Sequence, residues 1–173
     1  MKKTVLTFGL LSGAILAGLG AILVPVCMSA EYDNMEIVGY SAMILAFIVV
    51  FFGVRSYRDN VGGGTITFGK ALGIGLLMTL IACAMYVAVW EIVYFNFVPD
   101  FVDNYSTNVI EKLRRSGATA QKVQERIDEM ARFKKLYANP ALNVLMTFGE
   151  VFPVGLIVAL VSAGILRRKP AVA

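Results

Sequence analysis

The chain has 173 residues, of which 58% are hydrophobic and 16% are charged, and its formal net charge is +4. Soluble domains average roughly 45–50% apolar and 25% charged residues, so this composition excludes an ordinary soluble globule. The basic residues stand mostly at the ends of apolar runs, where lipid headgroups and membrane orientation explain them. We therefore expect the lipid bilayer as a partner and no nucleic acid.

The first apolar run covers residues 4–28 and follows Lys2 and Lys3. A signal peptide begins in the same way, but its apolar core is typically about 7–15 residues long and ends at a cleavage site of small residues. Here the run is much longer, and Met28 occupies a position of that site, so we predict a retained transmembrane helix. Small residues at four-residue spacing predict close packing of this helix against another helix of the same chain. They are Gly9, Gly13, Ala17 and Ala21.

Three further apolar runs are long enough to cross a hydrocarbon core of about 30 Å at 1.5 Å per residue. They cover residues 37–54, 71–98 and 141–166. The third span carries small residues near its start, Gly69 and Gly73, and the last carries a small-residue seam, Gly155, Ala159 and Ala163. Pro153 interrupts the last run, and a proline in a helix interior predicts a kink.

A charged segment, residues 99–140, separates the third and fourth spans. Its apolar residues recur at helical spacing, Ser116 and Gly117 indicate a helix end, and Thr119 can cap a second helix. These features predict a helical hairpin, which is either a cap resting on the bundle or a docking surface for a partner protein. The fold class is therefore all-α, with four transmembrane helices and a charged helical hairpin between the third and fourth.

The distribution of basic residues predicts that both termini are cytoplasmic, because the connection containing Glu31, Asp33 and Glu36 has no Lys or Arg. This orientation makes the 99–140 insert extracytoplasmic. The eight basic residues of the insert argue against it, but six acidic residues are interspersed with them. Cys27 and Cys83 lie within apolar runs without CxxC spacing, so we interpret them as buried small hydrophobic residues and expect no disulfide.

Residues 64–71 nearly match the GxxxxGK[ST] phosphate-binding loop. Ala71 lacks the hydroxyl that binds magnesium, and the segment joins two membrane helices instead of following a strand. We therefore interpret the glycine-rich segment, with Gly63 and Gly64, as a flexible turn between helices and expect no nucleotide cofactor. The chain contains no histidine, and no residue spacing indicates a metal site or a catalytic group, so we expect no enzyme. The pair Asp100 and Asp103 is typical of a solvated helix boundary.

Glu91 and Glu150 are the acidic residues within apolar runs, and an ionisable group inside a membrane suggests a function because its burial is costly. The two carboxylates are candidates to share a proton or a cation, or to face a polar cavity. The structural alternative is that Glu91 reaches headgroup water beside Trp90 and Tyr94, and that Glu150 is hydrogen-bonded across the bundle.

The central segment carries a resemblance to a known family. Gly53 to Asp59 reads GVRSYRD, and after a glycine-rich spacer Ile66 to Ala71 reads ITFGKA. This pattern resembles the hallmark of the bacterial integral membrane family called domain of unknown function 4199, over roughly residues 3–169. The block of likeness includes Tyr57, Arg58, Asp59, Gly63, Gly64, Phe68 and Gly69. The resemblance implies four membrane helices and a bacterial inner membrane, and it implies no activity.

Two functional hypotheses follow. The first is a non-enzymatic structural or interaction module, which acts through contacts with another copy of itself or with a partner membrane protein. The alternative is a small transporter or channel component in which Glu150, with or without Glu91, handles a proton or cation. A membrane enzyme ranks third.

Overall fold

A computed structural model describes the backbone of residues 1–29 and 35–168, and the side chains of residues 1–24 and 37–168. The predictions for Cys27, Glu31, Asp33 and Glu36 lie outside the described side chains. Within the described part the chain is all-α, with six helices. They are α1 (Lys2–Ser29), α2 (Met35–Asn60), α3 (Phe68–Asn96), α4 (Phe101–Arg115), α5 (Ala120–Tyr137) and α6 (Pro140–Leu166).

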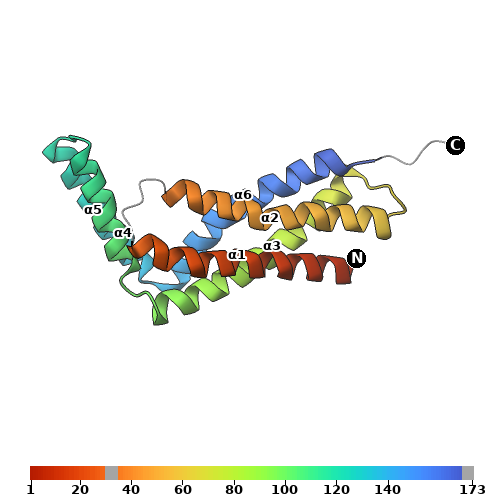
Figure 1. The fold of residues 1–173 in the computed structure, drawn as a ribbon, viewed down its shortest axis with the longest axis horizontal. Coiled ribbons are helices and arrows are strands. Elements are labelled where there is room, and N and C mark those ends of the chain that lie inside the picture. The colour runs from red at the N-terminus through yellow and green to blue at the C-terminus, as the bar shows by residue number, and fades with distance from the viewer. Residues whose placement is uncertain (30–34, 169–173) are drawn as a thin grey trace.

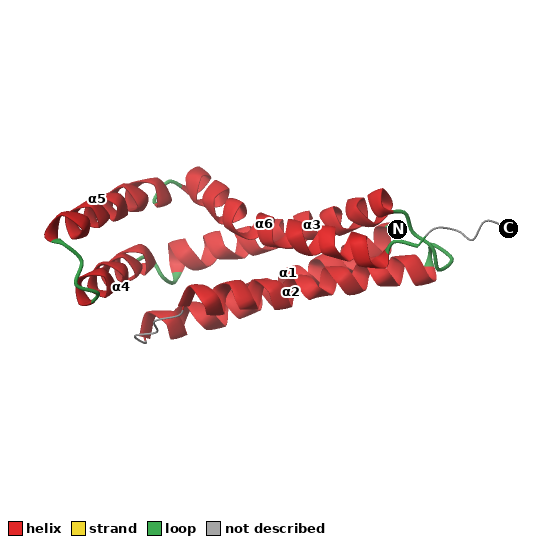
Figure 2. Cartoon of the chain, turned by 90° about the horizontal axis from the view of Figure 1, so that it is seen from above, coloured by secondary structure: helices red, strands yellow, loops and turns green. Residues whose placement is uncertain are grey.

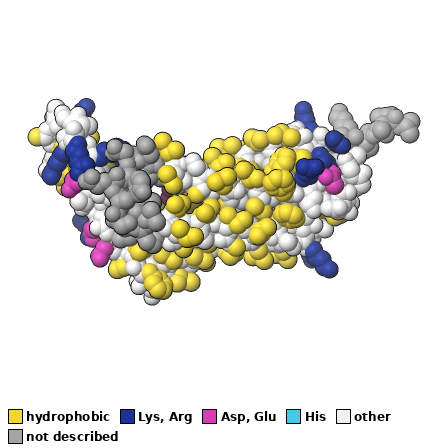
Figure 3. Space-filling model, viewed as in Figure 1, with side chains coloured by type: hydrophobic (Ala, Val, Ile, Leu, Met, Phe, Trp, Pro, Cys, Tyr) yellow, Lys and Arg dark blue, Asp and Glu magenta, His cyan; other side chains and the backbone are white. Residues whose placement is uncertain are grey.

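Four of these helices, α1, α2, α3 and α6, are long and apolar enough to cross a membrane, which confirms the predicted fold class. They run alongside one another as a bundle, and α4 and α5 project from one end of it (Figures 1 and 2). Figure 3 shows a broad hydrophobic surface along the bundle between two regions where charged side chains gather. This pattern is typical of a protein whose middle faces hydrocarbon and whose ends face headgroups.

Helices α1 and α6 each pack against both α2 and α3. In a membrane this packing depends on close approach, because lipid is as apolar as the helix surfaces. A Cβ atom added at Gly9 would lie 3.0 Å from Cβ of Ile81. One added at Gly13 would lie 3.1 Å from Cα of Ala82. The prediction that the small residues of the first span pack within the chain is thus confirmed at these positions, whereas Ala21 is exposed.

The small-residue seam of α6 is confirmed as well. Ala159 and Ala163 are fully buried, and a Cβ added at Gly155 would lie 2.4 Å from Cγ2 of Thr79. The pair at the start of α3 behaves differently, since a Cβ at Gly69 or Gly73 would have no neighbour within 4 Å. Helix α3 instead approaches α6 through Gly75, where an added Cβ would lie 3.1 Å from Cβ of Ala159.

The boundaries of the second and third spans differ from those expected from the apolar runs. Helix α2 continues past residue 54 to Asn60, and α3 begins at Phe68 instead of residue 71. The predicted span ended at residue 54 because Arg55 is charged, but a charged residue does not end a helix. Arg55 forms an ion pair of 3.6 Å with Asp59, one helical turn later. Helix α3 begins earlier because Thr67 caps it, accepting a hydrogen bond of 3.4 Å from the backbone N–H of Lys70.

The predicted hairpin consists of α4 and α5. Gly117, with φ of 75°, reverses the chain after α4, and Thr119 caps α5 by accepting a hydrogen bond from the N–H of Lys122. Asn139 then caps α6, whose first helical residue is Pro140. Helix α6 remains helical through Pro153. Helix α5 contacts α6 and α4 contacts α1, so the hairpin is held on the end of the bundle.

The beginning of α1 and the end of α6 lie at the same end of the bundle, together with the connection from α2 to α3 (Figure 1). We call this end the base, and the end that carries α4 and α5 the hairpin end. The fold therefore places the glycine-rich segment and the two candidate acidic residues at different ends of the molecule.

Candidate functional site

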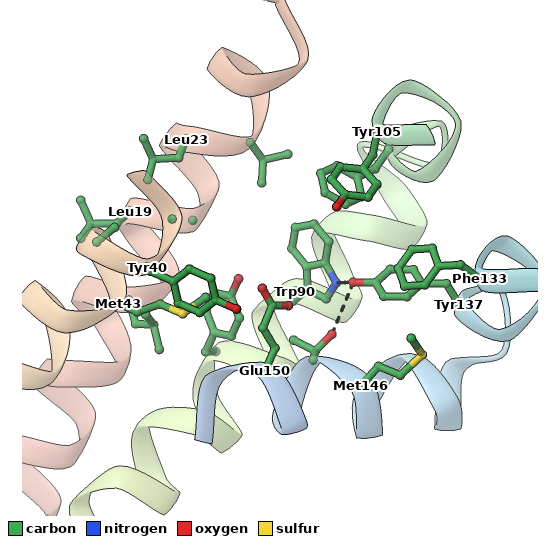
Figure 4. Close-up of a pocket in the computed structure, with 18 of the residues that line it drawn as sticks. Leu19, Leu23, Tyr40, Met43, Trp90, Tyr105, Phe133, Tyr137, Met146 and Glu150 are labelled. Carbon is green, nitrogen blue, oxygen red and sulfur yellow. Dashed lines mark hydrogen bonds between the residues drawn. The ribbon is translucent and has the colours of Figure 1, made fainter. Parts of the chain in front are cut away.

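A cavity of about 630 Å³ opens at the hairpin end, and residues from all six helices line it (Figure 4). Its lining is mainly apolar and aromatic. The aromatic members are Tyr40, Tyr86, Trp90, Phe101, Tyr105, Phe133 and Tyr137. Cavities that hold small ligands are typically about 300–1,000 Å³ in volume and combine apolar walls with a few polar groups. The volume and the mainly apolar lining of this cavity fall within that range.

Glu150 is the one acidic residue among the described residues that line the cavity, and no described lining residue is basic. Its carboxylate points into the cavity, toward Tyr40 of α2 and Trp90 of α3 (Figure 4). Tyr86 and Tyr137 lie close enough to interact with it electrostatically. No hydrogen bond or ion pair joins the carboxylate to any side chain that the structure describes. The hydrogen bonds across the bundle that were the structural alternative for Glu150 are therefore not found within this part of the chain.

The depth of Glu150 follows from its place in α6. It lies ten residues after Pro140, about 15 Å along the helix axis at 1.5 Å per residue. This distance puts it well inside the span on the hairpin side. A carboxylate at that depth without a partner in the protein is costly unless water or a ligand compensates its charge.

A chain of hydrogen bonds forms the wall of the cavity beneath the hairpin. The indole Nε1 of Trp90 donates to the hydroxyl of Tyr137 at 2.9 Å, and that hydroxyl lies 3.5 Å from Oγ1 of Thr147. Thr147 donates to Oδ1 of Asn143 at 3.2 Å, and Asn143 donates to the carbonyl oxygen of Tyr137 at 3.1 Å. Burial raises the pKa of the Tyr137 phenol, which keeps it protonated at neutral pH. This chain joins α3, α5 and α6 and fixes one side of the cavity.

Stacked and edge-on aromatic rings surround the same hydrogen bonds. The centroid of the Phe101 ring lies 5.2 Å from that of Trp90, and the Tyr137 centroid lies 5.1 Å from Tyr94 and 5.0 Å from Phe133. Ring pairs at such distances stabilise a contact beyond the area they bury. The apolar positions of the hairpin nearest the bundle are therefore used to attach it and to line the cavity.

Glu91 does not belong to the described lining of this cavity. Its Oε1 atom is buried without a hydrogen-bond partner among the described atoms, and the residue is intermediate in exposure. The structure thus places only Glu150 of the two candidates at the cavity. No group of three or more His, Cys, Asp or Glu residues within the described chain is arranged to hold a metal ion.

The glycine-rich segment at the base is a turn held by hydrogen bonds. The N–H of Gly64 donates to the carbonyl oxygen of Arg58 at 2.9 Å, and Gly63 and Gly64 have φ of 60° and 83°, which favours glycine. A Cβ at Gly62 would lie 2.5 Å from the carbonyl oxygen of Thr65. The segment is a turn between helices, as expected, and the backbone hydrogen bonds and the close approach at Gly62 determine its shape.

The same segment holds the end of α6. Ile66 and Arg168 form an antiparallel bridge with hydrogen bonds of 3.1 and 2.9 Å, and Nη1 of Arg58 lies 3.5 Å from the carbonyl oxygen of Leu166, to which it donates. Asp59 orients Arg58 by accepting a hydrogen bond of 2.7 Å from its Nε. We call these contacts of Arg58, Ile66, Leu166 and Arg168 the base clamp.

The remaining residues of the block have structural roles too. Tyr57 is buried, and Nζ of Lys70 lies over its ring, 5.5 Å from the centroid. Phe68 and Gly69 lie in the first turn of α3. In a phosphate-binding loop the backbone N–H groups of this turn bind the ligand, but here the N–H of Lys70 donates to the side chain of Thr67. The block therefore joins α2, α3 and α6.

A family model described as a protein of unknown function (DUF4199) matches residues 7–168. The chain belongs to this family. The match confirms the resemblance seen in the central block, and with the four apolar helices it identifies a membrane protein of unknown function. No curated protein and no solved structure matches the chain.

Within this DUF4199 chain, sequence reasoning found Glu150 but missed the hydrogen-bonded wall beside it. Trp90 was considered only as a neighbour of Glu91 near headgroup water, Tyr137 was one of the unnamed apolar residues at helical spacing in the insert, and Asn143 and Thr147 were not singled out. A signal was present, because Asn143 and Thr147 are polar residues one helical turn apart within an apolar run. That spacing indicates a polar stripe which needs partners inside the protein.

Proposed function

We propose that this protein is a small transporter or channel component, which takes a small molecule into the cavity at the hairpin end and uses Glu150 to handle a proton or cation. One observation carries the proposal: the cavity is lined by all six helices and contains a carboxylate that no described residue neutralises. A purely structural bundle gains nothing from such a group, since a carboxylate at this depth of a membrane span is costly.

The orientation is part of the proposal. Basic residues gather at the base, so the positive-inside rule favours a cytoplasmic base. They include Lys2, Lys3, Arg55, Arg58 and Lys70. The cavity then opens on the extracytoplasmic side of a bacterial inner membrane. A cysteine introduced at Ser116, in the turn of the hairpin, tests this orientation. It should react with a membrane-impermeant maleimide added to whole cells, and reaction only after the cells are lysed would reverse the orientation.

Reconstitution into liposomes loaded with a pH-sensitive dye tests transport itself. We expect proton flux under an imposed potassium diffusion potential or sodium gradient, and we expect Glu150→Gln to abolish it. Glu91→Gln is the matched control, because it removes a carboxylate of the same type outside the described lining of the cavity. The absence of flux under all of these conditions, or equal flux in Glu150→Gln, would refute the proposal.

The interaction module is less well supported by the geometry. The hairpin was a candidate docking surface for a partner protein, but its aromatic residues line the cavity and pack against the bundle. They are Phe101, Tyr105, Phe133 and Tyr137. The outer surface of the hairpin is mostly charged and exposed. Such a surface is ordinary for a solvated helical pair and indicates no particular partner.

A further inference from the structure

The charge and the aromatic lining of the cavity indicate which class of ligand it binds. We propose that it binds an amphipathic organic cation, whose positive group pairs with Glu150 and whose apolar body lies against the aromatic walls. This inference rests on the proposed function for the location of the site, and it names the class of ligand that the site accepts.

Charge provides the first argument. Glu150 faces a cavity whose described lining contains no Lys or Arg, so the carboxylate would repel an anionic ligand and no basic residue of that lining would offset the repulsion. A neutral ligand would leave that charge uncompensated. Of these three kinds of ligand, only a cation pairs with the carboxylate.

The aromatic walls supply the second argument. Figure 4 shows the Glu150 carboxylate directed toward the rings of Tyr40 and Trp90, and Tyr86 and Tyr137 also line the cavity. Aromatic faces attract cations through their quadrupole, and quaternary ammonium groups are commonly recognised by cages of such rings. One carboxylate surrounded by Tyr and Trp is thus suited to an organic cation.

Size and donor chemistry argue against a calcium or magnesium ion as the ligand of this cavity. The cavity measures about 630 Å³, whereas hard cations need six to eight oxygen ligands at close distance. The described residues offer no group of three or more potential metal ligands. A molecule with a substantial apolar body is needed to fill the space between Leu19 and Leu23 of α1 and Met146 of α6.

Two probes of nearly the same shape and opposite charge test the inference. Tetraphenylphosphonium is a cation and tetraphenylborate is an anion, so their comparison isolates the effect of charge from that of apolar contact. Binding is measured by equilibrium dialysis of the full-length protein in a neutral detergent, with protein-free micelles as background. Emission of Trp90, the single tryptophan of the chain, reports whether the probe reaches the cavity wall.

We expect saturable binding of tetraphenylphosphonium accompanied by a change in Trp90 emission, and at least about tenfold weaker binding of tetraphenylborate. Glu150→Gln should weaken binding of the cation by about tenfold or more, and it should reduce the difference between the probes. Glu91→Gln should bind both probes as the natural chain does. Gly39→Phe fills the cavity from α2, where an added Cβ meets nothing within 4 Å, and should weaken binding of either probe.

Equal binding of both probes, or binding of the cation that Glu150→Gln leaves unchanged, would overturn the inference. So would the absence of saturable binding of the cation. These results are distinct from failure of the proposed function, which is measured by Glu150-dependent proton flux. Glu150-dependent flux without charge-selective binding would refute an organic cation as the ligand and leave the transport proposal standing. Charge-selective binding without flux would refute transport and leave the organic-cation site standing.

Discussion

The indole nitrogen of Trp90 and the hydroxyl of Tyr137 are 47 residues apart in sequence and share a buried hydrogen bond of 2.9 Å. This bond attaches the last turn of α5 to the wall of α3 at the edge of the cavity. The hairpin therefore depends on a specific polar contact in addition to the packing of its rings.

Replacing Tyr137 with Phe removes the hydroxyl and leaves Nε1 of Trp90 without its acceptor. Leaving a buried donor unsatisfied costs about 1–3 kcal/mol, so we expect thermal unfolding at a lower temperature and an altered Trp90 emission spectrum. Tyr40→Phe is the control, because its side chain is 48% exposed. In a double-mutant cycle with Trp90→Phe, strictly additive losses of stability would contradict a direct coupling of the two groups.

Gly155 marks the closest approach of α6 to the bundle core. A Cβ there would lie 2.4 Å from Thr79 and 2.8 Å from the ring of Phe47, so Gly155→Ala should destabilise the protein by about 1–3 kcal/mol through overpacking. Gly164→Ala is the control, because Gly164 lies in the same helix and an added Cβ there has no neighbour within 4 Å. This substitution should leave the unfolding temperature unchanged or raise it. Equal unfolding temperatures for the two variants, measured in one detergent, would show that α6 does not pack as described.

Arg58 and Arg55 lie three residues apart on α2, but only Arg58 takes part in the base clamp. Arg58 is 8% exposed and donates to the carbonyl oxygen of Leu166, so Arg58→Met should cost about 1–3 kcal/mol. The side chain of Arg55 is 56% exposed in its pair with Asp59, and Arg55→Met should cost less than about 1 kcal/mol. Limited proteolysis should also cut the end of α6 faster in Arg58→Met, and equal rates in both variants would refute the clamp.

Lys134 of α5 and Asp103 of α4 form an ion pair of 2.5 Å that links the two helices of the hairpin. The hydrogen bond to Asp103 raises the pKa of Lys134. The pair therefore stabilises the folded state fully below the unfolded lysine pKa of about 10.4, and this contribution is lost as the pH rises through the folded value. Asp103→Asn should lower stability at neutral pH, with the difference fading in strongly alkaline solution.

Salt gives an independent check on this pair, because both side chains are more than half exposed and an exposed pair is screened. The effect of Asp103→Asn should shrink at high ionic strength. Glu129→Gln is the control, since Glu129 pairs with Arg126 inside α5 and links no second helix. A difference between the natural chain and Asp103→Asn that persists at high salt and high pH would mean that charge is not its cause.

The fold was largely predictable from the sequence, because apolar length and capping residues act locally. Thr119 and Gly117 were recognised as a cap and a helix end from their own chemistry, and both have those roles in the structure. The spacing of small residues predicted the seam through Gly155. It did not predict which helix packs against that seam. That depends on the arrangement of four helices of similar hydrophobicity.

The site was predictable in part. Glu150 stood out because a carboxylate in an apolar run is costly, while its separation from Glu91 depends on the rotation of α3 and α6 about their axes. The extent of α2 was underestimated because the apolar run ends at Arg55 and the helix does not. The role of Arg58 was hidden as well, since its acceptor at Leu166 is 108 residues further along the chain.

The bridge between Ile66 and Arg168 has a consequence for how this chain can change in length. Helix α3 is held by the base clamp at its start and by the Trp90 to Tyr137 hydrogen bond near its end. Helix α6 is held at its start by the hydrogen bond from Asn143 to the carbonyl oxygen of Tyr137 and at its end by the base clamp. Inserting one residue into either helix would shift everything beyond it by about 1.5 Å and rotate it by about 100°. One of the two attachments would then be lost. Substitutions along these helices can therefore be absorbed locally, whereas a single insertion or deletion between the two attachments should disrupt the cavity or the clamp.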